Sequence, residues 1–305
     1  MIWIKKLEFI NVSKDADSEH GIRDLNFFVP ECGIYALYAR NRITLSHVLK
    51  LAAGLKQPDY GDIRLFGDKL TKKNQLLLNK IGLLPEPPAF YPNLSVADNL
   101  KLLAMLRPRQ VFTMTEDAIN LLDIWDYRKL KAASLDTAQK KRLGLAIALM
   151  HNPELLILND PFSGLNSQGI KEISKLFSQL CHDYGKTILL TSNNLDDVES
   201  IADCIAYMEN GSIIQEFSRK EREKINQQYI CVVADHVSAI IPIIESQLNI
   251  NQFDVIDDQT MRIYDLTIGS SSINGCLNQN SINVKEIYYH QGTLQEYLDY
   301  ISRGL

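Results

Sequence analysis

Through its first 217 residues the chain alternates short apolar runs with segments whose apolar residues recur at helical spacing. The apolar runs predict β-strands at residues 3–10, 25–29, 34–38, 63–66, 155–158, 187–191 and 205–208. The helical spacings predict helices at residues 45–53, 95–106, 114–122, 138–150, 170–184 and 195–202. This alternation is typical of the α/β class, and the first two strands are expected to form an antiparallel N-terminal region.

The composition changes near residue 218. Residues 218–227 are strongly charged and predict a linker. Beyond it the pattern predicts strands at residues 229–233, 253–256, 261–268 and 284–289, and helices at residues 237–248 and 294–302. We therefore expect a larger domain at residues 1–217, with a helical subdomain at about 86–150, and a small α+β domain at residues 228–305.

Composition narrows the class of protein. Of the 305 residues, 46% are hydrophobic and 23% are charged, which is typical of globular proteins. The net charge of −5 gives no general attraction to nucleic acid or to anionic lipid, so no nucleic-acid partner is expected. No apolar run approaches 18 residues, so any membrane association is expected to come through a protein partner.

Cysteine and histidine usage predicts a reducing compartment and no metal site. The five cysteines are scattered without a CxxC pair, as free thiols of a cytoplasmic protein are. Three histidines stand apart from the cysteines and from one another in the sequence, which disfavours a metal centre: His47, His151 and His290.

Four blocks of the larger domain occur in a recognisable order. They are GIYALYARNRITLSHVLKLAAGLKQPDYGDIRLFGDKL (33–70), IGLLPEPPAFYPNLSVADNL (81–100), SLDTAQKKRLGLAIALMHNPELLILNDPFSGLN (134–166) and TILLTSNNLDDVESIADCIAYMENGSII (187–214). In order and spacing they resemble the ATP-binding subunits of ABC transporters over residues 2–215. The tail, GTLQEYLDYISRGL, is similar to the C-terminal domain of the drug- and bacteriocin-export type. The resemblance implies a P-loop NTPase-like domain with a mixed sheet core and a helical subdomain.

The first block departs from the resemblance where a triphosphate would bind. A phosphate loop uses glycines to turn backbone amides toward phosphate, a lysine to neutralise it and Ser or Thr to hold Mg²⁺. Here the glycine positions carry Ala39, Arg42 and Thr44, and the lysine position carries Leu45. Side chains with a Cβ resist the positive φ that such a loop requires. Only Ser46 keeps its expected role.

Two arginines in this vestigial phosphate loop leave alternatives open. Arg40 and Arg42, which flank Asn41, either supply replacement charge to a phosphate or are solvated or salt-bridged side chains. The second interpretation is favoured, because isolated loop arginines are usually solvated or paired with acids.

The remaining catalytic positions of the resemblance are also altered. Glu86 stands where a glutamine would orient water and metal, and Asn159 stands where an aspartate would hold Mg²⁺. Asp160 is one methylene shorter than the glutamate expected as general base, and Asn193 replaces a histidine that would contact the γ-phosphate. No catalytic residue is therefore intact.

The third block carries the signature segment, where Ser-Gly-Gly would meet the γ-phosphate of a partner's nucleotide. This chain has Asp136, Thr137 and, at the end of the segment, Gln139. Asp136 is expected to be the N-cap of the following helix, bonding to the amides that an anion would use. Two like charges ~4 Å apart cost about 4 kcal/mol at an effective dielectric near 20, so the segment predicts a poor site for a partner's ATP.

Two segments retain the family pattern for protein contacts. Phe90 and Tyr91 either form a wall that receives a helix of a membrane subunit, or pack between the two lobes of the domain. Ser163 and Asn166 lie in a turn that, by resemblance, meets its counterpart across a dimer interface.

Three hypotheses follow. The leading one is a non-catalytic ABC subunit that assembles with or regulates a membrane permease, as a homodimer or as a heterodimer with another ABC ATPase subunit, peripheral on the inner face of the membrane. The second is an active ATPase that uses atypical ligands, and the third is a soluble nucleotide-binding or interaction protein on the same fold. No cofactor is expected under the first hypothesis beyond weak ATP binding without Mg²⁺.

Overall fold

The computed structural model describes residues 5–71, 74–105, 120 and 122–302. The chain divides into two compact units, Met1–Ser218 and Arg219–Leu305. Within the described ranges, no helix combines the length and the apolar character that crossing a bilayer requires.

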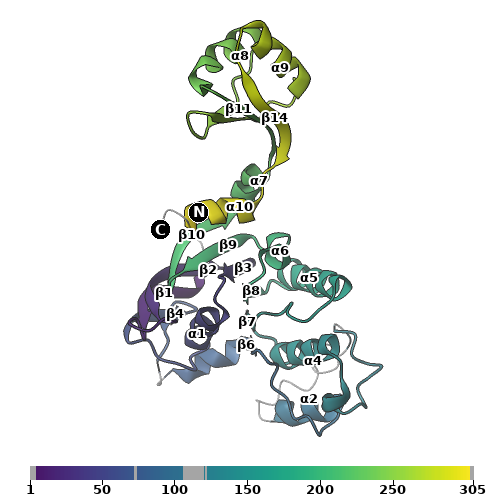
Figure 1. Ribbon diagram of the computed structural model, residues 1–305. Helices are drawn as coiled ribbons and strands as arrows, with labels where there is room; N and C mark the ends of the chain where they lie inside the picture. The colour runs from purple at the N-terminus through teal and green to yellow at the C-terminus, as the bar shows by residue number, and fades with distance from the viewer. Residues whose placement is uncertain (1–4, 72–73, 106–119, 121, 303–305) are drawn as a thin grey trace. The chain divides into compact units, whose positions relative to one another are not determined.

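A six-stranded sheet forms the centre of the first unit, in the order β10-β9-β3-β8-β7-β6 (Figure 1). β10 pairs antiparallel with β9, and the other neighbouring strands pair in parallel. Every residue of β3 is buried, as expected for a strand covered on both faces. The strands are β3 (Ile34–Tyr38), β6 (Ile81–Leu84), β7 (Leu155–Asn159), β8 (Thr187–Ser192), β9 (Cys204–Glu209) and β10 (Ser212–Ser218).

A second, antiparallel sheet has the order β2-β1-β4-β5. It contains β1 (Lys5–Lys14), β2 (Ile22–Pro30), β4 (Tyr60–Leu65) and β5 (Asp68–Lys69). Alternate residues of β2 are buried, because one face of this sheet packs on the core. The predicted antiparallel N-terminal region is confirmed, as is the α/β class with a mixed sheet.

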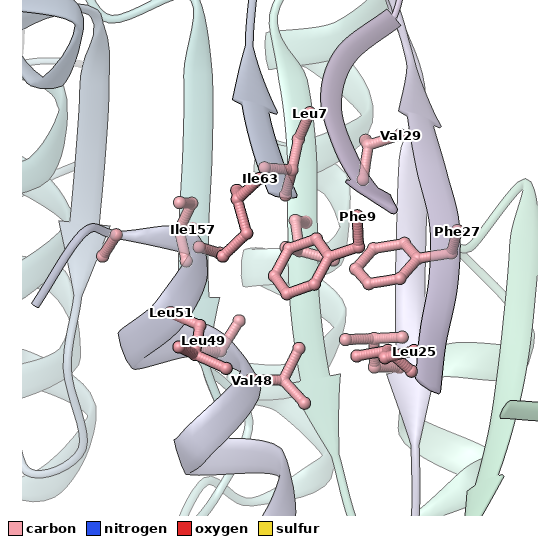
Figure 2. Close-up of a cluster of buried hydrophobic side chains, with 14 of the residues drawn as sticks. Leu7, Phe9, Leu25, Phe27, Val29, Val48, Leu49, Leu51, Ile63 and Ile157 are labelled. Carbon is pink, nitrogen blue, oxygen red and sulfur yellow. The ribbon is translucent and has the colours of Figure 1, made fainter. Parts of the chain in front are cut away.

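Helix α1 (Arg42–Ala52) supplies the hydrophobic layer between these two sheets. Figure 2 shows Val48 and Leu51 of α1 in one cluster with Ile157 of β7 and with Phe9 and Phe27 of the antiparallel sheet. The rings of Phe9 and Phe27 stack with their centroids 4.6 Å apart. The helix begins three residues before the predicted residue 45, because Asn41 provides the N-cap.

Further helices cover the other parts of the first unit. α5 (Ser167–His182) buries an apolar stripe, and α6 (Leu195–Glu199) follows β8. α2 (Val96–Met105) and α4 (Thr137–Leu149) form a helical lobe in which α4 packs against β6 (Figure 1). Short 3₁₀ turns occur at Gln75–Lys80 (η1) and Ala132–Ser134 (η3). Most of the helix predicted at residues 114–122 lies outside the described residues.

The second unit carries a four-stranded antiparallel sheet of order β12-β13-β11-β14 with two helices, α8 and α9, in a β-α-β-β-α-β sequence. Its core is formed by alternate strand residues and the apolar faces of these helices. The elements are α7 (Arg219–Ile225), β11 (Gln228–Ala234), η4 (Val237–Ala239), α8 (Ile241–Leu248), β12 (Phe253–Val255), β13 (Thr260–Ile263), α9 (Ser270–Gln279), β14 (Val284–Gln291) and α10 (Leu294–Ser302).

Three sequence predictions for this part of the chain need correction. The linker expected at residues 218–227 contains α7, because its Arg, Lys and Glu residues are good helix formers and α7 packs on α10. The strand expected at residues 261–268 ends at Ile263, and Asp265 then forms a turn by accepting the Thr267 amide at 3.0 Å. The helix α9 was not predicted, because only Ile273 and Leu277 of its polar sequence are buried.

Candidate functional site

The candidate site lies where parallel strands of the six-stranded sheet end. Residues 39–42 follow β3, Glu86 follows β6, Asp160 follows β7 and Asn193 follows β8. The paired strand ends Tyr38 and Ser192 mark the same edge of the sheet. In open α/β sheets ligands bind outside this carboxyl edge, so the sheet topology brings the sequence-predicted positions to one region.

The amides at the start of α1 are already bonded within the chain. Asn41 has extended backbone angles, φ −93° and ψ 105°, and its side-chain oxygen accepts from the amides of Ile43 at 2.9 Å and Thr44 at 3.4 Å. The Asn41 amide group also contacts Nδ1 of His20 at 2.9 Å. A helix N-terminus attracts anions through such free amides, and here a neutral side chain occupies two of them.

Leu45 belongs to the hydrophobic core. Its side chain is 2% exposed and lies in the cluster that joins α1 to both sheets. Ser46, one residue further on, is only partly buried. His47 is also partly buried, and burial together with nearby lysines lowers its pKa. The lysine position of the phosphate loop is therefore a packing position in this chain.

Arg42 and Asp160 form an ion pair across the site. The Arg42 side chain is 53% exposed, whereas Asp160 retains 9%, so the guanidinium covers a nearly buried carboxylate. This is the salt-bridged alternative of the two interpretations of the loop arginines. Arg40 is exposed and lines a cavity of about 170 Å³ at the phosphate loop, together with Asn41, Thr44 and the acidic residues Glu19 and Glu209.

The residues after β7 are held by β8. The Thr191 hydroxyl donates to the Asn159 side-chain oxygen at 3.0 Å. The Asp160 amide donates to the backbone oxygen of Thr191 at 3.1 Å. Asp160 itself has a φ of 46°, in the left-handed region that non-glycine residues rarely adopt. The side-chain oxygen of Asn159 is thus hydrogen-bonded to the neighbouring strand β8.

Two further polar residues lie at the end of β8. Asn193 is exposed in the turn before α6, where the Ser192 hydroxyl bonds the backbone of Asn194. Burial raises the pKa of Asp197 in α6, and the Asp160 carboxylate raises it further. Asp197 thus places a second carboxyl group near Asp160, in the region in which a phosphate would need positive charge.

Lys141 is the site residue that the sequence analysis missed. Its side chain is 2% exposed, and its ammonium pairs with Glu86 and donates to the Asp160 backbone oxygen at 2.8 Å and to Ser163 Oγ at 3.2 Å. In the sequence it is the second of three consecutive cations. It lies four residues before the buried Leu145 on the helix, and this spacing was the signal available for finding it.

The start of α4 carries the predicted N-cap. Asp136 accepts the Gln139 amide at 2.8 Å, and the Gln139 side-chain oxygen accepts the Asp136 amide at 3.1 Å, which completes a capping box. Thr137 is exposed at the first helical position. The predicted cap is confirmed, and one of the amides that an anion would use is bonded to a carboxylate.

The residues predicted to contact partners take defined positions. Tyr91 is 50% exposed, and its backbone amide donates to the buried Asn99 side chain at 2.7 Å, whereas Phe90 is half-buried. The Ser163 hydroxyl oxygen accepts the hydrogen bond from the Lys141 ammonium described above. Asn166 caps α5 by accepting the Gly169 amide at 2.8 Å. Tyr91 and Asn166 remain accessible to another protein.

Known proteins match this chain over its whole length. A family described as ABC transporter matches residues 22–163. The bacitracin transport ATP-binding protein BcrA of Enterococcus faecalis is 32% identical over 304 residues, covering 100% of this chain and 98% of that protein. The lantibiotic transport ATP-binding protein SrtF of Streptococcus pyogenes is 29% identical over 223 residues, covering 73% of this chain and 95% of that protein.

Solved structures match the fold. The dimeric structure of MJ0796, a bacterial ABC transporter cassette, has a TM-score of 0.63 at 19% identity and covers 70% of this chain and 98% of its own. CbiO1 from Clostridium perfringens, part of the ABC transporter complex cbiONQ, has a TM-score of 0.64 at 21% identity. It covers 81% of this chain and 97% of its own.

Proposed function

Because the chain belongs to the ATP-binding proteins of ABC transporters, we propose that it is a subunit of a transport complex that does not hydrolyse ATP. ATP-binding subunits of this family work with membrane permeases and form dimers. The proposed role is to assemble with a permease and a second ATP-binding subunit, at the inner face of the membrane, and to support or regulate transport there.

The burial of Leu45 is the single observation that carries the non-catalytic proposal. A lysine in this position makes charge-assisted contacts with phosphate, each worth about 1.5–3 kcal/mol. Leu45 makes none and is 2% exposed within the core. A neighbouring cation would have to replace the lysine, and Arg42 is already paired with Asp160.

The fit of an ATP molecule to the surrounding groups is poor for the same reason. Asn41 and Asp136 use the helix amides that phosphates would occupy, and Asp160 and Asp197 bring carboxylates to the site. Removing one preorganised electrostatic donor typically costs on the order of 10²–10³ in rate. The chain lacks the lysine, the metal ligand, the base and the switch histidine of the family pattern. Their separate effects on the rate do not add, but together these losses are expected to leave little ATP hydrolysis.

The relatives suggest the kind of transport. Two of them are named for bacitracin and lantibiotic transport. We propose that the partner is a permease of the drug- or bacteriocin-export type. Its test is co-purification of this chain with a candidate permease in detergent, with Tyr91→Ala as the variant. Recovery of wild type with the permease, and loss with Tyr91→Ala, supports the proposal, and indifference to every candidate permease contradicts it.

An active ATPase is the second candidate, favoured by similarity along the full length of a bacitracin transport ATP-binding protein. In that case Arg42 would leave Asp160 and bind phosphate, and Asp160 would act as base. Steady-state phosphate release separates the two candidates. The proposed function predicts equal, blank-level release by wild type and Asp160→Asn, whereas release that disappears in Asp160→Asn supports the ATPase.

A further inference from the structure

Helix α4 is buried around much of its circumference, and one of its faces meets the loops that follow β6 and β7. Thr137, Lys141 and Gly144 are spaced four and three residues apart, so they lie on the same face of the helix. Each of the three has a close neighbour in a segment outside the helix, in addition to the apolar packing of the buried α4 residues.

The two ends of this face are close steric contacts. A Cβ added at Gly144 would lie 2.5 Å from Leu84 Cδ1 at the end of β6 and 3.0 Å from Pro88 Cβ, so a larger residue would require these neighbours to shift. A Cβ added at Gly164, in the turn after β7, would lie 2.9 Å from Thr137 Cγ2. The helix is therefore in tight contact with both segments.

Lys141 forms the polar centre of this face. Its ammonium reaches acceptors on three separate positions, which are Glu86 after β6, the Asp160 backbone oxygen after β7 and Ser163 in the following turn. A buried ammonium is costly unless it is paired and hydrogen-bonded, and these three acceptors use its three donors.

We propose that Lys141, with Glu86, Asp160 and Ser163, is a built-in clamp that holds α4 on the sheet without any nucleotide. The clamp joins the helical lobe to the loops that follow β6 and β7. It fixes the first turn of α4 and residues 160–166 in one arrangement. This inference deepens the proposed function, because it names how a subunit without ATP chemistry keeps its lobe in position.

Hydrogen exchange on the full chain tests the clamp, with Lys141→Gln as the variant and Lys140→Gln as the matched control. Lys140 precedes Lys141 on the same helix and is only partly buried. Lys141→Gln is expected to lower amide protection of residues 137–149 and 160–166 by about tenfold or more, because it removes the buried donor to the Asp160 backbone oxygen and to Ser163 as well as the partner of Glu86. Lys140→Gln is expected to change protection less than about twofold. Equal protection in the two variants would overturn the clamp.

A double variant covers the possibility that Lys141→Gln unfolds the chain. Glu86→Gln with Lys141→Gln replaces the ion pair by two amides, which hydrogen-bond to each other without a buried charge. Protection in the double variant is expected to exceed that in Lys141→Gln. A loss of amide protection in the double variant that equals the sum of the losses in the two single variants would count against a polar clamp. Full protection in a Ser163→Ala variant would count against it as well.

A nucleotide arm separates this inference from the proposed function. The same amides are followed in wild type with and without millimolar Mg·ATP. Protection that stays constant is expected. Protection that rises with Mg·ATP overturns the nucleotide independence of the clamp, whereas the non-catalytic role is tested by phosphate release and not by protection.

Discussion

The interior of the first unit keeps the apolar residues expected of an ABC-type domain, whereas the loops at the carboxyl edge of its sheet depart from the family pattern. The interior has buried strands, stacked aromatic rings and an apolar α1, as an ABC-type domain requires. The loops, in contrast, carry internal ion pairs where a nucleotide would bind. The comparison teaches that the fold depends on many interior contacts, whereas the chemistry depends on a few loop side chains that can change without disturbing it.

The largest expected effect breaks the interior. Phe9→Ala removes a ring that is 2% exposed and stacked on Phe27. It is expected to lower the free energy of unfolding by about 3–5 kcal/mol in urea denaturation, because a large cavity remains. The control is Phe28→Ala on the neighbouring strand β2, where the ring is 37% exposed. Equal losses for the two variants would mean that the interior is not the source of stability.

Leu45→Lys tests whether the position that carries a lysine in the family pattern belongs to the hydrophobic core of this chain. A lysine at position 45 is expected to lower the free energy of unfolding by about 2 kcal/mol or more, because it removes the packing of the leucine side chain and buries an ammonium. The neighbouring Ile43 is 49% exposed, so Ile43→Lys should have little effect. Undiminished stability of Leu45→Lys, together with new ATP binding, would show that the position still faces a phosphate site.

Alanine substitutions at two helical glycines are expected to change the stability of the chain in opposite directions. Alanine at Gly144 clashes with Leu84 and Pro88, and it is expected to lower the free energy of unfolding by about 1–3 kcal/mol. Alanine at Gly275 in α9 meets no atom within 4 Å, and it is expected to raise stability by up to about 1 kcal/mol through helix propensity. Denaturation of both variants measures the difference. Stabilisation by Gly144→Ala would contradict a close approach of α4 to β6.

The smallest effect concerns the acidic charge at the site. The pKa of Asp197 is raised in the folded chain, mainly by burial, so its ionised form opposes folding. This penalty is absent below the unfolded pKa and fully present above the folded pKa. Asp197→Asn is therefore expected to stabilise the chain at neutral pH and to lose that advantage as the pH falls toward 4 or below. Thermal unfolding at both pH values checks the trend, and an advantage that grows in acid would contradict it.

Periodicity predicted the interior well because burial on both faces leaves a clear apolar pattern. The strand predicted at residues 34–38 coincides with β3, and the helix predicted at 138–150 differs from α4 by one residue at each end. The Asp136 cap was also predictable, because a cap depends on neighbouring residues. The polar α9 and the charged α7 were missed, since only Ile273 and Leu277 of α9 and Arg222 of α7 are buried.

The candidate site was predictable in position but not in its internal contacts. The altered positions after β3, β7 and β8 follow predicted strands, whereas Glu86 follows β6, which was not predicted. Pairing of these parallel strands brings the positions to one edge of the sheet. The pairing of Arg42 with Asp160 and of Lys141 with Glu86 joins residues far apart in the sequence. No local pattern specifies such pairs, although the spacing of Lys141 from Leu145 indicates which of the three cations is buried.

Calorimetry with ATP on the full chain, with and without Mg²⁺, tests the central claim most directly. A chain in which Leu45 packs in the core and Arg42 is paired with Asp160 is expected to show no Mg²⁺-dependent binding, and at most weak binding that persists in EDTA. Saturable binding that requires Mg²⁺, and that weakens when Ser46 is replaced by alanine, would contradict the account.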